Sequence, residues 1–265
     1  MKIISLTEIW IYPIKSLGGI LLNEAAVMPK GLAYDRRWML ADDNGVFLTQ
    51  RKYPEMALFK LMMGEDNLQV RFQADVLDIP LHPEVSEKQR ASIWDDEVIV
   101  LKMGKQYDQW FSERLGINCQ LLYFPEANER KVDQAYASPG DNVSLADGYP
   151  FLIIGQSSLD DLNQRLEIPV PMNRFRPNFV FTGADAFAED TWKEIRIGEI
   201  EFKLVKPCAR CVLTTVNQET AEKGEEPLRT LTTFRKQNGK VMFGQNMLAA
   251  NLGKIKVNEK IEIIA

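Results

Sequence analysis

Short apolar runs separated by polar turns dominate the first half of the chain. Their length and alternation predict strands over residues 3–14, 20–28, 37–41, 58–63, 68–72 and 97–101. Asp-Asp-Asn-Gly at 42–45 predicts a hairpin turn, because Asn-Gly tolerates positive φ. A helix is expected over 106–115, where aromatic residues recur at helical spacing and Gly116 marks its end. Such a series of short strands indicates a barrel or a sandwich.

The second half mixes strands with short helices. Strands are predicted over residues 149–155, 178–182, 195–197, 200–205, 212–216 and 254–264. Ser158 and Asp161 have capping-box spacing in a helix predicted over 157–166, and Pro227 suits the first turn of another through 235. Residues 126–147 are polar and predict a linker or a mobile crossing segment. We therefore expect a β-rich α+β protein with domains at 1–125 and 126–265.

Composition narrows the class of protein. The 265 residues are 45% hydrophobic and 26% charged, as in an ordinary globular chain, and the net charge of −5 argues against nucleic acid as the main ligand. Three cysteines without a framework of spacings favour a reducing compartment. Glu8 and Pro13 interrupt the apolar start, so it does not read as a signal peptide, and no apolar run is long enough to span a membrane. These features predict a cytoplasmic protein without a membrane partner.

The segment Lys206-Pro207-Cys208-Ala209-Arg210-Cys211 carries the strongest chemical signal. A structural zinc site needs four Cys or His ligands, and here Cys119 and His82 are both distant from the pair. A thioredoxin-type thiol needs a helix N-terminus, whereas a strand is predicted after Cys211. Two interpretations of the cysteine pair remain. One is a soft thiolate beside two cations, which suits a redox-active metal centre. The other is structural, with the two cysteines acting as small apolar residues that end a loop. These six residues leave both interpretations open.

Three further segments place cations where predicted strands begin or end. Lys15 and Ser16 precede Gly18-Gly19, a composition that suits an anion-binding corner. Arg36 and Arg176 each lie just before a strand, where a guanidinium could grip a phosphate. Each segment has an ordinary alternative, such as a solvated lysine or an arginine paired with Asp35. Together, in an acidic protein, they hint at one compound anionic ligand.

Seven motifs in order along the chain resemble the MOSC family (molybdenum cofactor sulfurase C-terminal domain), and specifically members with a MOSC N-terminal β-barrel domain. That group includes bacterial reductases of N-hydroxylated base analogues and the mitochondrial amidoxime-reducing component. The motifs cover essentially the whole chain: Tyr-Pro-Ile-Lys-Ser at 12–16, Asp-Arg-Arg-Trp at 35–38, Ala-Asp-Gly-Tyr-Pro at 146–150, Phe-Arg-Pro-Asn at 175–178, Glu-Asp-Thr-Trp at 189–192, Pro-Cys-Ala-Arg-Cys at 207–211 and Phe-Gly-Gln-Asn at 243–246.

The resemblance implies an N-terminal β-barrel-like domain packed on a MOSC β-barrel with a few short helices. It also implies a molybdenum–pterin cofactor whose metal takes one protein thiolate, the second Cys of the pair, here Cys211. Cys208 is then not a ligand. The residues that the resemblance assigns to the pterin and its phosphate are Lys15, Ser16, Arg36 and Arg176, with Asn178 and Tyr149 in matching motifs. The implied activity is reduction of N-hydroxylated compounds.

One departure from some bacterial relatives concerns the electron supply. Those relatives carry a C-terminal ferredoxin-like domain, whose [2Fe–2S] cluster takes four cysteines. This chain ends at Ala265 with three cysteines in all. We therefore expect electrons from a separate ferredoxin-like protein or flavoprotein reductase. The alternatives are a non-catalytic cofactor carrier or sulfur-transfer protein and, with less support from spacing, a zinc module built on Cys119, Cys208, Cys211 and His82.

Overall fold

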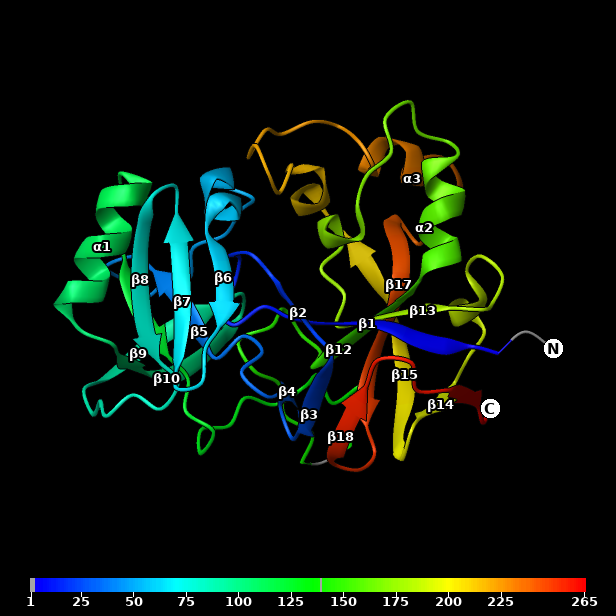
Figure 1. Cartoon of the computed structure of the whole chain (residues 1–265), viewed down its shortest axis with the longest axis horizontal. Helices are drawn as coiled ribbons and strands as arrows, with labels where there is room; N and C mark the ends of the chain where they lie inside the picture. The colour runs from blue at the N-terminus through cyan, green and yellow to red at the C-terminus, as the bar shows by residue number, and fades with distance from the viewer. Residues whose placement is uncertain (1–2, 139) are drawn as a thin grey trace.

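Two groups of strands lie side by side and account for most of the protein (Figure 1). The computed structural model describes residues 3–138 and 140–265. Within these ranges there are three α-helices against many short strands, which confirms the predicted β-rich α+β class. No helix in the described ranges has the length and hydrophobicity to cross a bilayer.

The first group contains two antiparallel sheets and a helix. One sheet has the order β5-β11-β10-β9 and the other the order β6-β7-β8. Helix α1 buries Tyr107 and Phe111, and the ring of Phe59 packs on Phe111 with centroids 5.6 Å apart. The helix ends at Gly116 in the left-handed conformation, as predicted. The element bounds are β5 (Trp38–Ala41), β6 (Lys60–Met63), β7 (Asn67–Phe72), β8 (Asp75–Pro80), β9 (Lys88–Ile93), β10 (Asp96–Lys102), α1 (Lys105–Leu115) and β11 (Gln120–Tyr123).

The second group is built on a large mixed sheet with the order β19-β14-β15-β17-β12-β13-β1-β2, and β16 pairs with β17. Its pairs are antiparallel except for β12 with β13. Stacked and edge-on contacts among Phe151, Phe179 and Phe202 fill its core. The bounds are β1 (Ser5–Ile11), β2 (Ile20–Leu22), β12 (Phe151–Gly155), β13 (Phe179–Thr182), β14 (Glu194–Ile197), β15 (Ile200–Arg210), β16 (Lys236–Gln237), β17 (Lys240–Ala249) and β19 (Ile261–Ile263).

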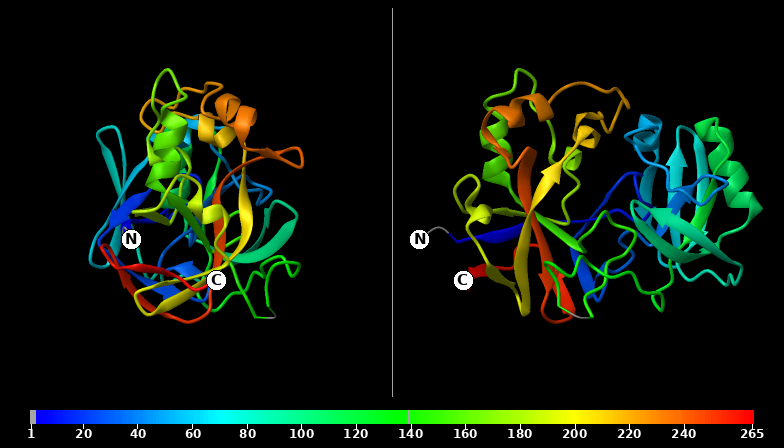
Figure 2. Two further views of the ribbon diagram at one scale, coloured as in Figure 1. Left: turned by 90° about the vertical axis from the view of Figure 1, so that its right-hand side faces the viewer. Right: turned by 180° about the vertical axis from the view of Figure 1, so that it is seen from behind.

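The chain crosses between the two groups more than once, as the view from behind shows (Figure 2). Strand β1 pairs with β13, and β3 (Glu24–Met28) pairs with β4 (Gly31–Leu32) and with β18 (Gly253–Lys256). The first strands are therefore hydrogen-bonded to the C-terminal half, and the chain enters the first group only afterwards. The division at residue 125 stays a prediction. The connections that follow β1 and β4 run along the seam between the groups, where Ile14 bridges to Trp38 and the Gly18 N–H bonds to the Phe59 carbonyl.

Several helices and strands begin or end at residues other than those predicted from the sequence. The single strand expected over 254–264 is two strands, β18 and β19, in different sheets. Helix α2 covers Gln156–Asn163, and the expected capping box is wrong, because Ser158 Oγ instead donates to the buried Glu189 carboxylate at 2.9 Å. The last helix, α3 (Leu228–Phe234), follows Pro227 as expected.

The polar segment after residue 125 connects β11 to β12; it is buried at residues 130, 132 and 143–146 and exposed at residues 133–136, and its mobility stays a prediction. Arg130 is 5% exposed and donates to the carbonyls of Ser144, at 2.9 Å, and of Ala146. The buried Lys30 ammonium donates to three carbonyls of the segment, those of Pro125, Glu126 and Asn128. These bonds fix the crossing segment against the seam and position the residues that follow it.

Candidate functional site

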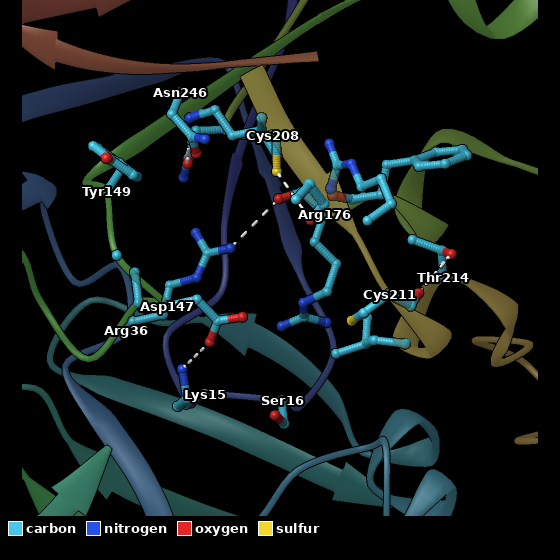
Figure 3. Close-up of a pocket in the computed structure, with 18 of the residues that line it drawn as sticks. Lys15, Ser16, Arg36, Asp147, Tyr149, Arg176, Cys208, Cys211, Thr214 and Asn246 are labelled. Atoms are coloured by element: carbon cyan, nitrogen blue, oxygen red, sulfur yellow. Dashed lines mark hydrogen bonds and ion pairs between the residues drawn. The ribbon is translucent and has the colours of Figure 1, made fainter. Parts of the chain in front are cut away.

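A pocket at the seam gathers all the site residues that the sequence predicted. Segments from both groups of strands and the crossing segment line it (Figure 3). The predicted residues that line it are Lys15, Ser16, Arg36, Tyr149, Arg176, Asn178 and Cys211. The pocket measures about 150 Å³ and adjoins a second cavity of about 740 Å³ through shared residues 147–149.

Three predicted residues occupy the left-handed backbone region, which L-residues other than Asn and Asp rarely adopt. The φ angles are 67° at Ser16, 51° at Arg36 and 53° at Arg176. Such conformations cost free energy and concentrate at functional sites. All three residues lie in connections between strands, and all three line the pocket.

Asp35 is a buried carboxylate that forms an ion pair with Arg36. Its carboxylate is fully buried, accepts the Tyr12 N–H at 2.7 Å and pairs with Arg36 Nη1 at 2.6 Å. Asn178 Nδ2 donates to the same carboxylate at 3.2 Å and to the carbonyl of Trp10. Because Asn178 Oδ1 also accepts the Leu152 N–H, the Asn178 amide is engaged within the protein on both sides. The contacts of Asn178 favour a positioning role over direct contact with a ligand.

Lys15 is buried beside a carboxylate. Its Nζ donates to Asp147 Oδ1 at 2.6 Å and to the carbonyl of Leu145 at 2.8 Å. Burial lowers the pKa of Lys15 to about 8, although Asp147 opposes that shift. Packing alone would raise the pKa of Asp147, but the charges of Lys15 and Arg51 outweigh it and hold that pKa below its usual value. Asp147 is therefore ionised at neutral pH.

Arg51, which sequence reasoning missed, links Asp147 to the cysteine pair. Its Nε donates to Cys211 Sγ at 3.1 Å, and its Nη2 donates to Asp147 Oδ2 at 3.0 Å. Burial would lower the pKa of Arg51, but Asp147 and the Cys211 sulfur raise it above its usual value. Arg51 therefore holds a guanidinium within hydrogen-bonding distance of the Cys211 sulfur and of the Asp147 carboxylate.

The two cysteines have different surroundings. Cys208 lies within β15, where burial raises the pKa of its thiol. Cys211 follows the end of β15, and residues 212–215 form a short 3₁₀ helix, so the predicted strand over 212–216 is wrong. The hydroxyls of Thr214 and Thr215 donate to the carbonyls of Cys211 and Val212, local bonds that compete with strand pairing. The turn places Cys211 Sγ at the pocket, next to Arg51.

The charge of the pocket fits an anionic ligand. Among its described lining residues, six are cationic (Lys15, Arg36, Arg51, Arg174, Arg176 and Arg210) and one, Asp147, is acidic. Three buried donors there have no partner among the described residues: Arg174 Nε, Arg210 Nη2 and the Tyr149 hydroxyl. Buried donors are normally satisfied, so these three indicate a missing acceptor-rich group. A pterin phosphate with a metal dithiolene, a soft centre for a thiolate, fits this set of side chains.

The zinc alternative does not fit. Within the described ranges no group of three or more His, Cys, Asp or Glu side chains is placed to hold a metal ion. Cys119 is buried against Ser112, and burial raises the pKa of its thiol to about 11. His82 instead lies 3.4 Å from the hydroxyl of Tyr34.

Comparisons with known proteins identify the family of the chain. Residues 3–118 match the MOSC N-terminal beta barrel domain, and residues 140–262 match the MOSC domain. The chain is 34% identical to the mitochondrial amidoxime-reducing component 1 of Mus musculus, over 98% of this chain and 82% of the mouse protein. It is 30% identical to the molybdenum cofactor sulfurase of Arabidopsis thaliana, over 90% of this chain and 32% of the plant protein.

Solved structures add little to the sequence relatives. The structural alignment with the YUAD protein of Bacillus subtilis covers 98% of this chain and 96% of the YUAD chain, with 8% sequence identity and a TM-score of 0.45. That similarity is too low to support an inference about the site. The family assignment rests instead on the sequence matches, which span both halves of the chain and the cysteine segment. The chain belongs to the MOSC family and carries the MOSC N-terminal beta barrel domain together with the MOSC domain.

Proposed function

We propose that this protein is a molybdenum-dependent oxidoreductase that reduces N-hydroxylated compounds. The observation that carries the proposal is the contact of Arg51 with Cys211, inside a cationic pocket with unpaired buried donors. The relative named an amidoxime-reducing component, which covers nearly the whole chain, supports the same class of reaction. Cys211 is the proposed metal ligand, with Cys208 outside the coordination sphere.

The proposed cofactor contacts follow from the geometry of the side chains. Arg36, Arg176, Arg174 and Arg210 would hold the phosphate and the polar edge of the pterin, with Ser16 and the Tyr149 hydroxyl as neutral partners. Lys15 and Asn178 would act beneath them, through Asp147 and Asp35. When bound, molybdenum supplies two-electron chemistry that removes the oxygen of an N–OH group. The ionised Asp147 holds Lys15 and Arg51 in place.

The partners and the compartment complete the proposal. Electrons would come from a separate ferredoxin-like protein or flavoprotein reductase, and the small-molecule substrate would be an N-hydroxylated compound such as an N-hydroxylated base analogue. The described cysteines are all free thiols, which suits a reducing, cytoplasmic setting.

The decisive experiment is turnover with an artificial electron donor. Protein with a molybdenum content confirmed by elemental analysis is mixed with a low-potential reduced dye and an N-hydroxylated base. We expect formation of the corresponding amine and oxidation of the dye. If molybdenum-loaded protein turns over no N-hydroxylated substrate with any donor, the function moves to a carrier or sulfur-transfer protein. The similarity to part of a cofactor sulfurase favours this second candidate.

A further inference from the structure

Arg51 reaches from one half of the protein to the proposed metal ligand in the other half. It lies within the residues that match the MOSC N-terminal beta barrel domain, whereas Cys211 lies within those that match the MOSC domain. Its Nε donates to Cys211 Sγ at 3.1 Å, although the two residues are 160 positions apart in the chain. The packing of the two halves against each other therefore supplies a hydrogen bond to the sulfur.

Two other side chains hold the guanidinium of Arg51 in this place. Its Nη2 donates to Asp147 Oδ2 at 3.0 Å, and its guanidinium carbon lies 4.4 Å from the ring centroid of Trp94. The Trp94 Nε1 donates to the same carboxylate, at 3.2 Å to Asp147 Oδ1. The ring, the carboxylate and the guanidinium thus fix one another, and the Nε of Arg51 is left directed at the sulfur.

The backbone of Trp94 is strained, which points to a role for its ring. Trp94 opens the two-residue turn between β9 and β10 with a φ of 55°, and glycine, asparagine and aspartate are the residues that such turns favour. The side chain is 47% exposed, so burial does not offset the strain. Its ring contacts are Arg51 on one side and Phe47, which packs edge-on with centroids 4.9 Å apart. Holding Arg51 is the role that these contacts support.

Arg51 differs from two other arginines of the pocket in how its donors are used. Arg174 Nε and Arg210 Nη2 have no partner among the described residues, whereas Arg51 directs one donor to a thiol sulfur and another to a carboxylate. Asp147 does not cancel the charge of Arg51, because the same carboxylate also pairs with Lys15. The three side chains together carry one net positive charge beside the sulfur.

We propose that Arg51 is a positioning residue that raises the reduction potential of the metal centre through its hydrogen bond to Cys211 Sγ, and that Trp94 keeps Arg51 in place. The inference rests on the proposed function, since it takes Cys211 as the metal ligand. A cation and an N–H donor at a ligating sulfur draw electron density away from the metal and stabilise its reduced, more negative state. The N-terminal half thereby adjusts the electronic properties of a metal that the C-terminal half binds.

A redox titration of molybdenum-loaded protein without substrate tests the proposal, with the electron paramagnetic resonance signal of molybdenum(V) as the readout. Arg51→Met removes the charge and the donor, whereas Arg51→Lys keeps the charge without the guanidinium fork. Trp94→Asn removes the ring and keeps a residue that tolerates positive φ. Lys52→Met is the matched control, because it removes one positive charge from the next residue, which is exposed and outside the pocket.

We expect Arg51→Met to shift the potential furthest to lower values. Arg51→Lys and Trp94→Asn should shift it in the same direction by less, and Lys52→Met should leave it at the wild-type value. Molybdenum content should stay near that of the wild type in all four variants, since Cys211 is unchanged. An unchanged potential in Arg51→Met, or equal shifts in Arg51→Met and Lys52→Met, would show that the hydrogen bond does not set the potential. Either result overturns the proposal.

Because the titration needs no substrate, its failure is distinguishable from failure of the proposed function. If the potentials shift as expected but the wild type reduces no N-hydroxylated compound, the proposed function is wrong and the role of Arg51 stands. If the wild type turns over and Arg51→Met keeps its potential, the role of Arg51 is wrong and the proposed function stands. Loss of molybdenum from Arg51→Met, with wild-type potentials in Arg51→Lys and Trp94→Asn, would show that Arg51 only retains the cofactor and would also overturn the proposal.

Discussion

Arg36 and Arg176 lie against the same aromatic ring, with their guanidinium carbons 4.3 and 4.1 Å from the centroid of Tyr12. Asp35 neutralises Arg36, whereas Arg176 has no ion-pair partner within the described ranges. Burial lowers the pKa of Arg176 to about 10, which records the cost of keeping an unpaired cation there. An anion between the two arginines would offset that cost.

Replacing Arg176 with Gln should therefore weaken cofactor binding more than it weakens the fold. Loss of one charge-assisted hydrogen bond, worth about 1.5–3 kcal/mol, lowers affinity about ten- to a hundredfold. Molybdenum retained at limiting cofactor measures the effect, and Arg196→Gln, at a side chain of β14 that is 44% exposed and outside the pocket, is the control. By contrast, Arg36→Ala should also lower the melting temperature of the cofactor-free protein, because it leaves the buried Asp35 unpaired. Unchanged occupancy in both pocket variants would contradict the anion site.

The two cysteines should respond differently to the same change. Cys211→Ser should lose molybdenum and all activity, because a hydroxyl is a poor and hard ligand for a soft centre. Cys208→Ser should keep the metal and a substantial share of activity, since its thiol lies in β15 with a raised pKa. Elemental analysis and turnover of both variants decide the matter. Equal losses, or a loss confined to Cys208→Ser, would show that the ligand assignment is wrong.

Stability should depend on pH through the buried Lys30. Burial lowers the pKa of Lys30 from 10.5 to about 8, although Glu126 opposes this. Between pH 8 and 10.5 the unfolded chain thus binds more protons at this lysine than the folded one, so its contribution to stability rises with pH in that window. Below pH 8 Lys30 is charged in both the folded and the unfolded chain, so burial of its ammonium group lowers the stability of the fold by the full amount. Lys15, with a pKa also near 8, acts in the same direction.

Chemical denaturation of wild type and Lys30→Met across pH 7 to 10.5 measures this pH-dependent contribution of Lys30 to the free energy of unfolding. At pH 7 the variant should be less stable by about 1–3 kcal/mol, because three carbonyls of the crossing segment lose their donor. Its stability should also rise less between pH 8 and 10.5 than that of the wild type. Parallel pH curves for the two proteins would show that Lys30 titrates normally in the fold.

The protein mixed with NADH and an N-hydroxylated substrate should be inert. No G-x-G-x-x-G fingerprint follows any strand, so direct binding of a nicotinamide dinucleotide has no support in the sequence. Activity should appear when a reduced ferredoxin-like protein, a flavoprotein reductase or a low-potential dye is added. Dye oxidation and product formation are the measurements. Steady turnover with NADH alone would reveal a nicotinamide site on this chain.

Local sequence signals predicted much of the fold. The Asn44-Gly45 turn forms as expected, with Gly45 at a φ of 77° and the Asp42 N–H bonded to the Val46 carbonyl. Strand β17 was missed, because Gly244, Gln245 and Asn246 interrupt its apolar pattern, yet it pairs on both sides with β15 and β12. Pairing with two neighbours in the interior of a large sheet stabilises a strand that its own sequence pattern does not predict.

Local sequence signals also predicted only some of the residues of the candidate site. Cations next to strand ends could be recognised within a few residues, and the structure brings Lys15, Arg36 and Arg176 together. Arg51 could not be found this way, since it lies 160 positions from Cys211 in a segment without a pattern.

The pairing of β1 with β13 also sets the order in which the molecule can be assembled. The Thr7 hydroxyl bonds to the Val180 carbonyl, 173 positions later in the chain. At ordinary rates of synthesis of about 5–20 residues per second, the first strand waits roughly 10 to 35 seconds before its neighbour leaves the ribosome. During that interval an apolar strand has an open edge in the cell, and the Lys15 and Ser16 bend that follows it has no pocket to join. The nascent chain therefore has a period in which its first strand is exposed, because the second half that covers it has not yet been made.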